Sequence, residues 1–102
     1  MRTLQISIAV RIIGRRPLRD FQVKHAAAVA PLERWYRIAF HASWANLTAV
    51  RRDFPHTDSV GASTIFNVHG NHYRLITRID YRKQKLYVVE VLTHAEYDRR
   101  YT

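Results

Sequence analysis

The alternation of apolar and polar residues predicts three consecutive strands in the second half of the chain. Phe66 and Val68 alternate with polar neighbours, and Gly70-Asn71 then interrupts the pattern as a two-residue hairpin turn would. Period-two alternation resumes over residues 72–81. Over residues 85–92 the apolar side chains fall on both faces, which is typical of a strand that is covered on both sides.

The first half of the chain has helical periodicity instead. Leu32, Trp35, Tyr36 and Ala39 follow the i, i+3, i+4, i+7 spacing, which predicts a helix whose apolar stripe packs on the sheet. We interpret its aromatic residues as core rather than as a platform for stacking bases. The other expected elements are a strand at 11–13, a helix at 17–25, a connector at 26–30, a short helix at 47–52 that Asn46 caps, and a loop at 56–63.

This order of elements predicts an α+β fold. We expect a mainly antiparallel sheet with N-terminal helices packed on one face and a short C-terminal helix. A length of 102 residues fits a single domain, residues 1–102. Met1–Ala9 is a possible N-terminal extension of that domain, and the pattern leaves open whether the first strand extends back to Leu4.

Thr93-His94-Ala95-Glu96 predicts the start of the C-terminal helix. It fits the capping box, in which the threonine and the glutamate satisfy each other's backbone N–H groups, so Glu96 is explained structurally. Tyr97 lies three residues after His94 and shares its helical face, whereas Asp98 is expected on another face at the surface. His94 is either an acid or base next to the sheet edge or only a surface residue of a capping motif.

Charge and composition narrow the classes of function. The formal net charge of +9, from 17 Lys and Arg against 8 Asp and Glu, indicates an anionic partner unless the basic residues form only a solvated face. The sequence has no cysteine, which removes disulfides and thiolate catalysis. No apolar run approaches the ~20 residues that span a bilayer, and a basic cluster follows the first apolar stretch, the reverse of a signal peptide. We therefore expect a cytoplasmic protein without membrane contact.

Two arginines on one predicted strand are candidates for contacting an anion. Arg74 and Arg78 share a side of the strand and lie ~13 Å apart by strand rise, so they would reach successive phosphates, or one phosphate and one base. The alternative is structural, with the arginines in ion pairs with acids such as Asp80 or Glu90.

A metal site is not predicted. His69 and His72 flank the hairpin turn and His94 is expected nearby, but no cysteine or paired carboxylate completes a zinc-like ligand set. We also find no glycine-rich phosphate loop and no nucleophile elbow.

Taken together, these residues resemble a known family. The chain is similar to the HigB toxins of bacterial type II toxin–antitoxin systems in the motifs Arg16-Pro17-Leu18, Pro31-Leu32-x-x-Trp35-Tyr36, Phe66-Asn67-Val68, Gly70-Asn71, Tyr73-Arg74-Leu75-Ile76 and Thr93-His94-x-Glu96-Tyr97-Asp98. The resemblance covers roughly Val10 to Tyr101. It implies a RelE-like fold and a metal-independent, cofactor-free endoribonuclease that cuts messenger RNA on the ribosome. It also implies inhibition by a HigA-like helix-turn-helix antitoxin, with DNA contacted only through the antitoxin complex.

The resemblance suggests that Arg74, His94 and Tyr97 match positions in the active-site region. In such a site, His94 would accept or donate a proton, Arg74 would hold the phosphorane, and Tyr97 would position or stack on a base. RNA contacts are expected from Asn71, Arg78, Lys83 and Lys85. The competing interpretation is a non-catalytic basic module that binds nucleic acid or an acidic partner and uses His94 only as part of the cap.

Overall fold

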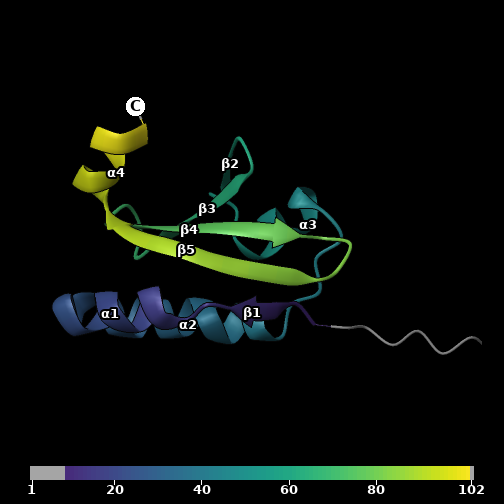
Figure 1. Ribbon diagram of the computed structural model, residues 1–102, viewed down its shortest axis with the longest axis horizontal. Coiled ribbons are helices and arrows are strands. Elements are labelled where there is room, and N and C mark those ends of the chain that lie inside the picture. Colours follow the sequence, from purple (N-terminus) through teal and green to yellow (C-terminus); the bar gives the residue numbers. More distant parts are fainter. Residues whose placement is uncertain (1–8, 102) are drawn as a thin grey trace, which may run out of the picture.

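The structure, a computed structural model, describes residues 9–101 and has the predicted α+β architecture (Figure 1). The elements follow in this order: β1 (Arg11–Ile13), α1 (Arg16–Lys24), the 3-10 turn η1 (Ala26–Ala28), α2 (Val29–Phe40), α3 (Leu47–Asp53), β2 (Asp58–Val60), β3 (Ser63–Val68), β4 (Tyr73–Asp80), β5 (Lys85–Thr93) and α4 (His94–Tyr101). The predicted extension Met1–Ala9 lies outside the described residues apart from Ala9.

The strands form one five-stranded sheet in the order β1-β5-β4-β3-β2. β1 pairs in parallel with β5, and every other neighbouring pair is antiparallel, so the prediction of a mainly antiparallel sheet is confirmed. Because β4 lies between β3 and β5, a side chain at the start of β4 is positioned by strands on both sides.

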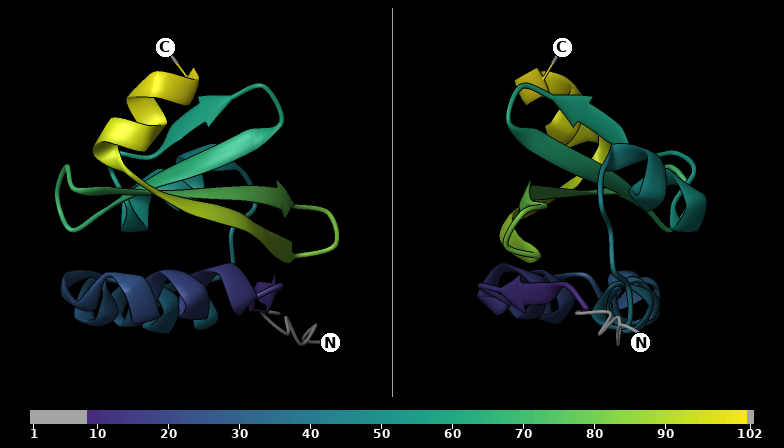
Figure 2. Two further views of the ribbon diagram at one scale, coloured as in Figure 1. Left: turned by 60° about the vertical axis from the view of Figure 1, so that its left-hand side comes forward. Right: turned by 90° about the vertical axis from the view of Figure 1, so that its right-hand side faces the viewer.

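The two faces of the sheet are covered by different elements. α1 and α2 lie side by side against one face, and α4 stands on the other (Figures 1 and 2). The face towards α1 and α2 holds the large core, which includes Leu32, Trp35, Trp44 and Phe66. Beneath α4, three buried residues among those that the structure describes form a second cluster, Ile65, Ile76 and Leu92. The active-site prediction concerns this second, smaller side.

Helix α2 confirms the predicted apolar stripe. Leu32, Trp35 and Ala39 are buried, and Tyr36 packs against the same core while partly exposed. The helix begins at Val29, within the expected connector at 26–30, so Pro31 lies in its first turn, where proline is tolerated because its N–H would have no partner. Asn46 caps α3 as predicted, its side chain accepting a hydrogen bond from the Ala49 N–H.

The expected loop at 56–63 is wrong, because this segment contains the edge strand β2. Asp58–Val60 pairs with β3, and Val60 lies opposite Ser63 across the two residues Gly61 and Ala62. Gly61 has φ +57°, a conformation that glycine adopts without strain. Every residue of β2 is exposed, so the strand has no apolar alternation by which its sequence would show it.

Strand β5 was predicted to be covered on both faces, but the structure leaves part of one face open. Its pairing with β4 shifts register, since Thr77 lies opposite Val88 whereas Ile76 lies opposite Glu90, which leaves Val89 as an extra residue in β5. Tyr87 is 40% exposed and Val89 44% exposed, so the middle of β5 is open on the face that carries α4. Within residues 9–101, no helix has the length and apolar character to cross a membrane.

Candidate active site

A four-residue turn at the start of β4 fixes the base of the candidate site. The β3–β4 ladder ends at Val68 opposite Tyr73, and the His72 N–H donates to the His69 carbonyl at 3.1 Å. The connection is longer than the predicted two-residue hairpin, because His69 and His72 also lie outside the ladder. Gly70, with φ +61°, occupies the first central position of the turn as the sequence predicted. The His94 N–H donates to the His72 carbonyl at 2.8 Å, which attaches the start of α4 to the same turn.

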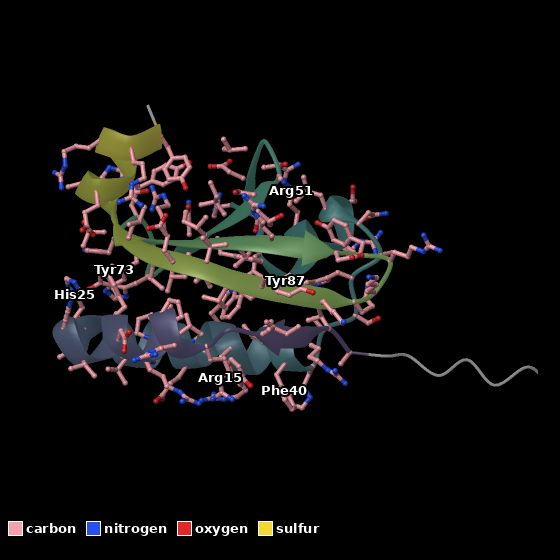
Figure 3. The ribbon with its side chains drawn as sticks, viewed as in Figure 1. Arg15, His25, Phe40, Arg51, Tyr73 and Tyr87 are labelled. Atoms are coloured by element: carbon pink, nitrogen blue, oxygen red, sulfur yellow. The ribbon has the colours of Figure 1, made fainter. Side chains whose placement is uncertain are left out.

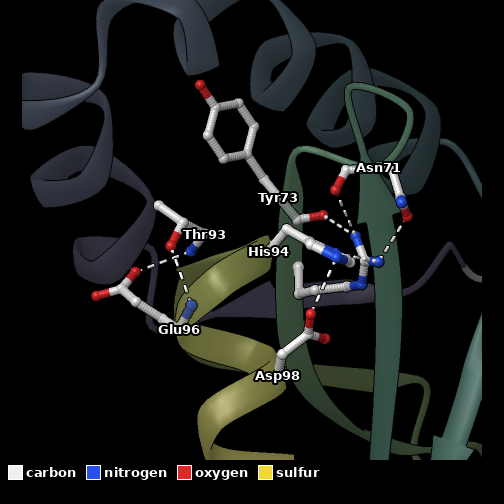
Figure 4. A network of polar contacts seen from close by, with 7 residues as sticks. Asn71, Tyr73, Thr93, His94, Glu96 and Asp98 are labelled. Atoms are coloured by element: carbon white, nitrogen blue, oxygen red, sulfur yellow. Dashed lines mark hydrogen bonds and ion pairs between the residues drawn. The ribbon is translucent and has the colours of Figure 1, made fainter.

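The capping box is confirmed and accounts for Glu96. Its Oε1 accepts a hydrogen bond from the Thr93 N–H at 2.8 Å, and the Glu96 N–H donates to Thr93 Oγ1 at 3.2 Å (Figure 4). The bond from the Thr93 backbone, followed by that from its hydroxyl, lowers the pKa of Glu96. The cap fixes where α4 begins and therefore where the side chain of His94 emerges.

Arg74 is buried and its terminal nitrogens are fully engaged. Only 7% of its surface is exposed. One terminal nitrogen donates to the carbonyls of Asn71 and Tyr73, both at 3.2 Å. The other donates to Asn71 Oδ1 at 2.7 Å and contacts His94 Nδ1 at 3.0 Å. Arg74 is thus held by backbone and neutral side chains.

Arg74 does not form the structural ion pairs with Asp80 or Glu90 that the sequence left open as an alternative. Asp80 accepts the Lys83 N–H at 3.0 Å in the β4–β5 turn, and Glu90 pairs with Arg100 of α4. In the described part of the chain, both acids named as alternatives are therefore engaged elsewhere. The guanidinium charge is directed to the imidazole instead.

The contacts of His94 define its protonation. A guanidinium can only donate hydrogen bonds, so Nδ1 of His94 must carry the lone pair. Nε2 then carries the proton and donates to Asp98 Oδ2 at 3.0 Å (Figure 4). His94 is a neutral imidazole between a cation and a carboxylate, and 45% of its side chain is exposed. The result is an ordered chain of contacts from Asn71 through Arg74 and His94 to Asp98.

The prediction that Asp98 lies on another face is wrong. It lies one helical turn after His94, and residues four apart share a helical face. The i, i+4 spacing of histidine and aspartate was visible in the sequence. That this spacing fixes the tautomer of His94 follows only from the contact of Arg74 with the other ring nitrogen.

Tyr97 completes the group from the same helix. The Arg74 guanidinium carbon lies 5.5 Å from the centre of the Tyr97 ring, and Tyr101 stacks on that ring at 4.8 Å. Burial, followed by the nearby charge of Asp58, raises the pKa of the Tyr97 phenol. The phenol therefore keeps its proton at neutral pH and remains a hydrogen-bond donor.

The structure gathers some of the predicted residues and separates others. Asn71, Arg74, His94 and Tyr97 lie together, while Arg78 is exposed further along the same strand. Lys83 and Lys85 lie at the opposite end of β4 and β5, where Lys85 is the register partner of Asp80 in the strand ladder. By strand rise that end is ~20 Å from Arg74.

The histidines near the turn do not assemble a metal site with acidic neighbours. The rings of His69 and His72 lie 4.6 Å apart. Among residues 9–101, no group of three histidine, aspartate or glutamate side chains is arranged to hold a metal ion.

The chain is similar in sequence to known proteins. Residues 28–100 match HigB_toxin, the RelE-like toxic component of a toxin-antitoxin system. An mRNA interferase HigB from Escherichia coli O6:H1 (strain CFT073) is 25% identical over 88% of this chain and 90% of its own length. An mRNA interferase toxin HigB from Escherichia coli K12 is 47% identical over a third of each chain. The chain therefore belongs to the HigB family of RelE-like toxins from toxin–antitoxin systems.

Proposed function

We propose that this toxin is a metal-independent endoribonuclease that cuts messenger RNA on the ribosome. The observation that carries the proposal is the position of His94, a half-exposed imidazole held between the Arg74 guanidinium and the Asp98 carboxylate. Its relatives from Escherichia coli carry the name mRNA interferase, which supports the same activity.

The reaction that fits these groups uses the RNA's own 2′-hydroxyl as nucleophile. A bond forms between the 2′-oxygen and the adjacent phosphorus, and the bond from phosphorus to the 5′-oxygen breaks. The 2′-hydroxyl loses a proton to a base, the phosphorane gains negative charge, and the 5′-oxygen takes up a proton. The site must therefore supply a lone pair, a cation and a donor.

His94 supplies the lone pair through Nδ1. Asp98 holds the proton on Nε2, which keeps the ring in the tautomer with Nδ1 unprotonated. When Nδ1 accepts the proton of the 2′-hydroxyl, the ring becomes a cation, and the carboxylate at 3.0 Å stabilises that charge. Asp98 acts through His94 and is a positioning residue.

Arg74 links substrate binding to exposure of this lone pair. All four N–H bonds of its two terminal nitrogens are directed at Asn71, the Tyr73 carbonyl and His94. A phosphate that binds either terminal nitrogen of the guanidinium must replace one of these partners. Replacement of His94 leaves Nδ1 uncovered beside the phosphate, so the cation and the base become available together.

Tyr97 is proposed as the donor. Its phenol remains protonated at neutral pH and its ring lies beside the Arg74 guanidinium. In that place its hydroxyl donates to the phosphate or to the leaving 5′-oxygen. The stacked rings of Tyr97 and Tyr101 offer an aromatic surface that supports an adjacent base.

The RNA is proposed to continue along the open face of the sheet. Arg78 is exposed on β4 and lies opposite the exposed Tyr87 of β5, which offers one phosphate contact and one apolar contact. Asn71 contributes by holding Arg74. Lys83, which is exposed, and Lys85, which is partly exposed, attract the backbone at longer range, because cations at the surface act on RNA over about a Debye length.

The ribosome is proposed to complete the site. The two carboxylates of α4, Glu96 and Asp98, already bind the cap and His94. Positioning the 2′-hydroxyl in line with the leaving oxygen is then left to the ribosome, which orders the messenger and gains several kcal/mol by orientation. Toxin–antitoxin membership makes an antitoxin the partner, and we propose a HigA-like helix-turn-helix protein through which alone the complex contacts DNA. Because the proposed activity acts on translation, we propose the cytoplasm as the place where the toxin works.

Cleavage of a defined message on purified ribosomes tests the proposal. The wild-type protein is compared with His94→Ala, with His56→Ala as an exposed histidine outside the site and with naked RNA alongside. Each toxin is used untreated or after treatment with EDTA, which is removed before the ribosomes are added because ribosomes need Mg²⁺. We expect ribosome-dependent cleavage that this treatment leaves intact and that only His94→Ala abolishes. Binding of the wild type to ribosomes without any cleavage would favour the non-catalytic module, and loss of cleavage after the EDTA treatment would contradict the metal-independent reaction.

A further inference from the structure

A shallow cavity of about 500 Å³ lies next to His94 at the end of the sheet. It is lined by His25, Asn71, His72, Tyr73, Thr93, His94 and Ala95. The cavity is therefore formed by three separate segments, the end of α1, the β3–β4 turn and the first turn of α4. Figure 3 shows His25 and Tyr73 at this end of the molecule, where α1 ends below the sheet.

The walls of this cavity are mainly aromatic rings. His25 stacks on Phe21 with ring centres 4.1 Å apart and an angle of 22°, and its ring lies 6.2 Å from that of Tyr73. The ring of His72 lies 6.1 Å from that of Tyr73. Two histidine rings thus lie near the same tyrosine, and His25 is held in place by Phe21.

The lining favours a flat, neutral group over a phosphate. Neither lysine nor arginine lines the cavity, so an anion would find no cation with the fixed charge that phosphates select. A nucleobase, in contrast, stacks on histidine and tyrosine rings, and single-stranded RNA is recognised in this way. His72 also offers a defined polar edge, because its Nδ1 contacts the His69 carbonyl at 2.8 Å and in the neutral ring leaves Nε2 as an acceptor.

The cavity is continuous with the candidate active site. Asn71 and His94 line it, and the same two residues hold Arg74. A nucleotide next to the cleaved bond therefore reaches the cavity while its phosphate lies at Arg74.

We propose that the His25–His72 cavity binds the base of a nucleotide that flanks the cleaved bond, and that it contributes to which sequences are cut. The proposal rests on the proposed nuclease function. Because the contribution is stacking, removal of the rings should lower kcat/KM roughly five- to hundredfold. The sequence preference at one position beside the cut should weaken, while the other positions keep theirs.

The test compares alanine and phenylalanine replacements in the full chain. His25→Ala, His72→Ala and the double variant remove the rings, whereas His25→Phe and His72→Phe keep a ring without imidazole chemistry. His41→Ala and His56→Ala serve as exposed controls, and circular dichroism checks the fold of each variant. Cleavage sites on ribosome-bound messages are mapped by sequencing. We expect loss of preference at one position in the alanine variants and retention within about threefold in the phenylalanine variants.

Binding is measured separately from cleavage with a short RNA that carries 2′-deoxyribose at the cleaved nucleotide and so cannot react. Its addition should shift the NMR signals of the His25 and His72 rings in the wild type and leave those of His41 and His56 unchanged. Cleavage by the wild type with an unchanged preference in the folded double alanine variant would overturn the proposed cavity alone. Loss of the sequence preference in the phenylalanine variants would also overturn it. So would NMR shifts of both rings on addition of the cognate antitoxin but not on addition of the RNA. A wild type that binds this RNA yet never cuts messages would refute the nuclease function instead.

Discussion

The β4–β5 hairpin has clusters of polar side chains at both ends, and the two ends use them differently. At the turn end, the Gln84 amide bonds to the backbone of Trp44 and Tyr81, and Asp80 caps the Lys83 N–H. At the other end, the bonds of Arg74 lead to a half-exposed imidazole. Both ends are basic, so charge alone does not separate them. The difference is that one set of bonds closes the fold and the other ends on a group that can move a proton.

The largest effect that separates the two ends is expected from Arg74→Lys. Lysine keeps the charge but cannot reach Asn71, the Tyr73 carbonyl and His94 with one planar group. We expect cleavage on ribosomes to fall about a hundredfold, since a directed donor is lost from the phosphorane. Arg78→Lys is the matched control on the same strand. Near-normal activity of folded Arg74→Lys would mean that only its charge matters.

A smaller effect is expected from Asp98→Ala. Loss of the carboxylate leaves the His94 Nε2–H without its acceptor at 3.0 Å and frees the ring to rotate or change tautomer. We expect single-turnover cleavage to fall roughly tenfold or more with KM little changed. Asp98→Asn should recover part of the loss, because the amide oxygen still accepts the hydrogen bond from Nε2–H. Asp20→Ala, an exposed acid of α1, is the control, and equal rates for it and Asp98→Ala would remove Asp98 from the mechanism.

Gln84→Ala tests the turn end by stability rather than by activity. The change removes the amide bonds to Trp44 and Tyr81, which we expect to cost about 2 kcal/mol of the free energy of unfolding. Urea denaturation measures this, and cleavage per folded molecule should stay the same. A catalytic defect at full stability would show that the turn end also belongs to the site.

The smallest effect is expected from Lys83→Gln combined with Lys85→Gln. Both residues lie at the end of the hairpin away from His94. We propose that they act on RNA only through their charge. We expect binding to weaken roughly threefold at low salt, with a flatter salt dependence and no change in the maximal rate. A loss comparable with that of Arg74→Lys would show that RNA contacts this end directly.

The sequence predicted those features that depend on near neighbours. Leu32 and Trp35 of α2 follow helical spacing and are buried, and Thr93 and Glu96 form the capping box as expected. In each case the pattern and its physical cause lie within a few residues. His94 was a candidate because this local motif placed it at the start of α4.

The features that the sequence did not predict depend on distant partners. Strand β2 consists of exposed residues and exists only because β3 pairs with it. The extra residue Val89 in β5 is defined by the register against β4. Asp98 is half-exposed as expected, but it shares the face of His94, and its contact with the ring matters because Arg74, on a distant strand, occupies the other ring nitrogen. The engagement of Arg74 likewise follows from backbone carbonyls of the turn.

The central claim is that Arg74 and His94 work as one unit, and a double-mutant cycle tests it most directly. Ribosome-bound message is cleaved by wild type, Arg74→Ala, His94→Ala and the double variant, with folding checked by circular dichroism. If the guanidinium both holds the phosphate and uncovers Nδ1, each single change abolishes most of the activity and the double variant is little worse than either. Losses that multiply would show two independent contributions, and full activity in folded Arg74→Ala would contradict the account.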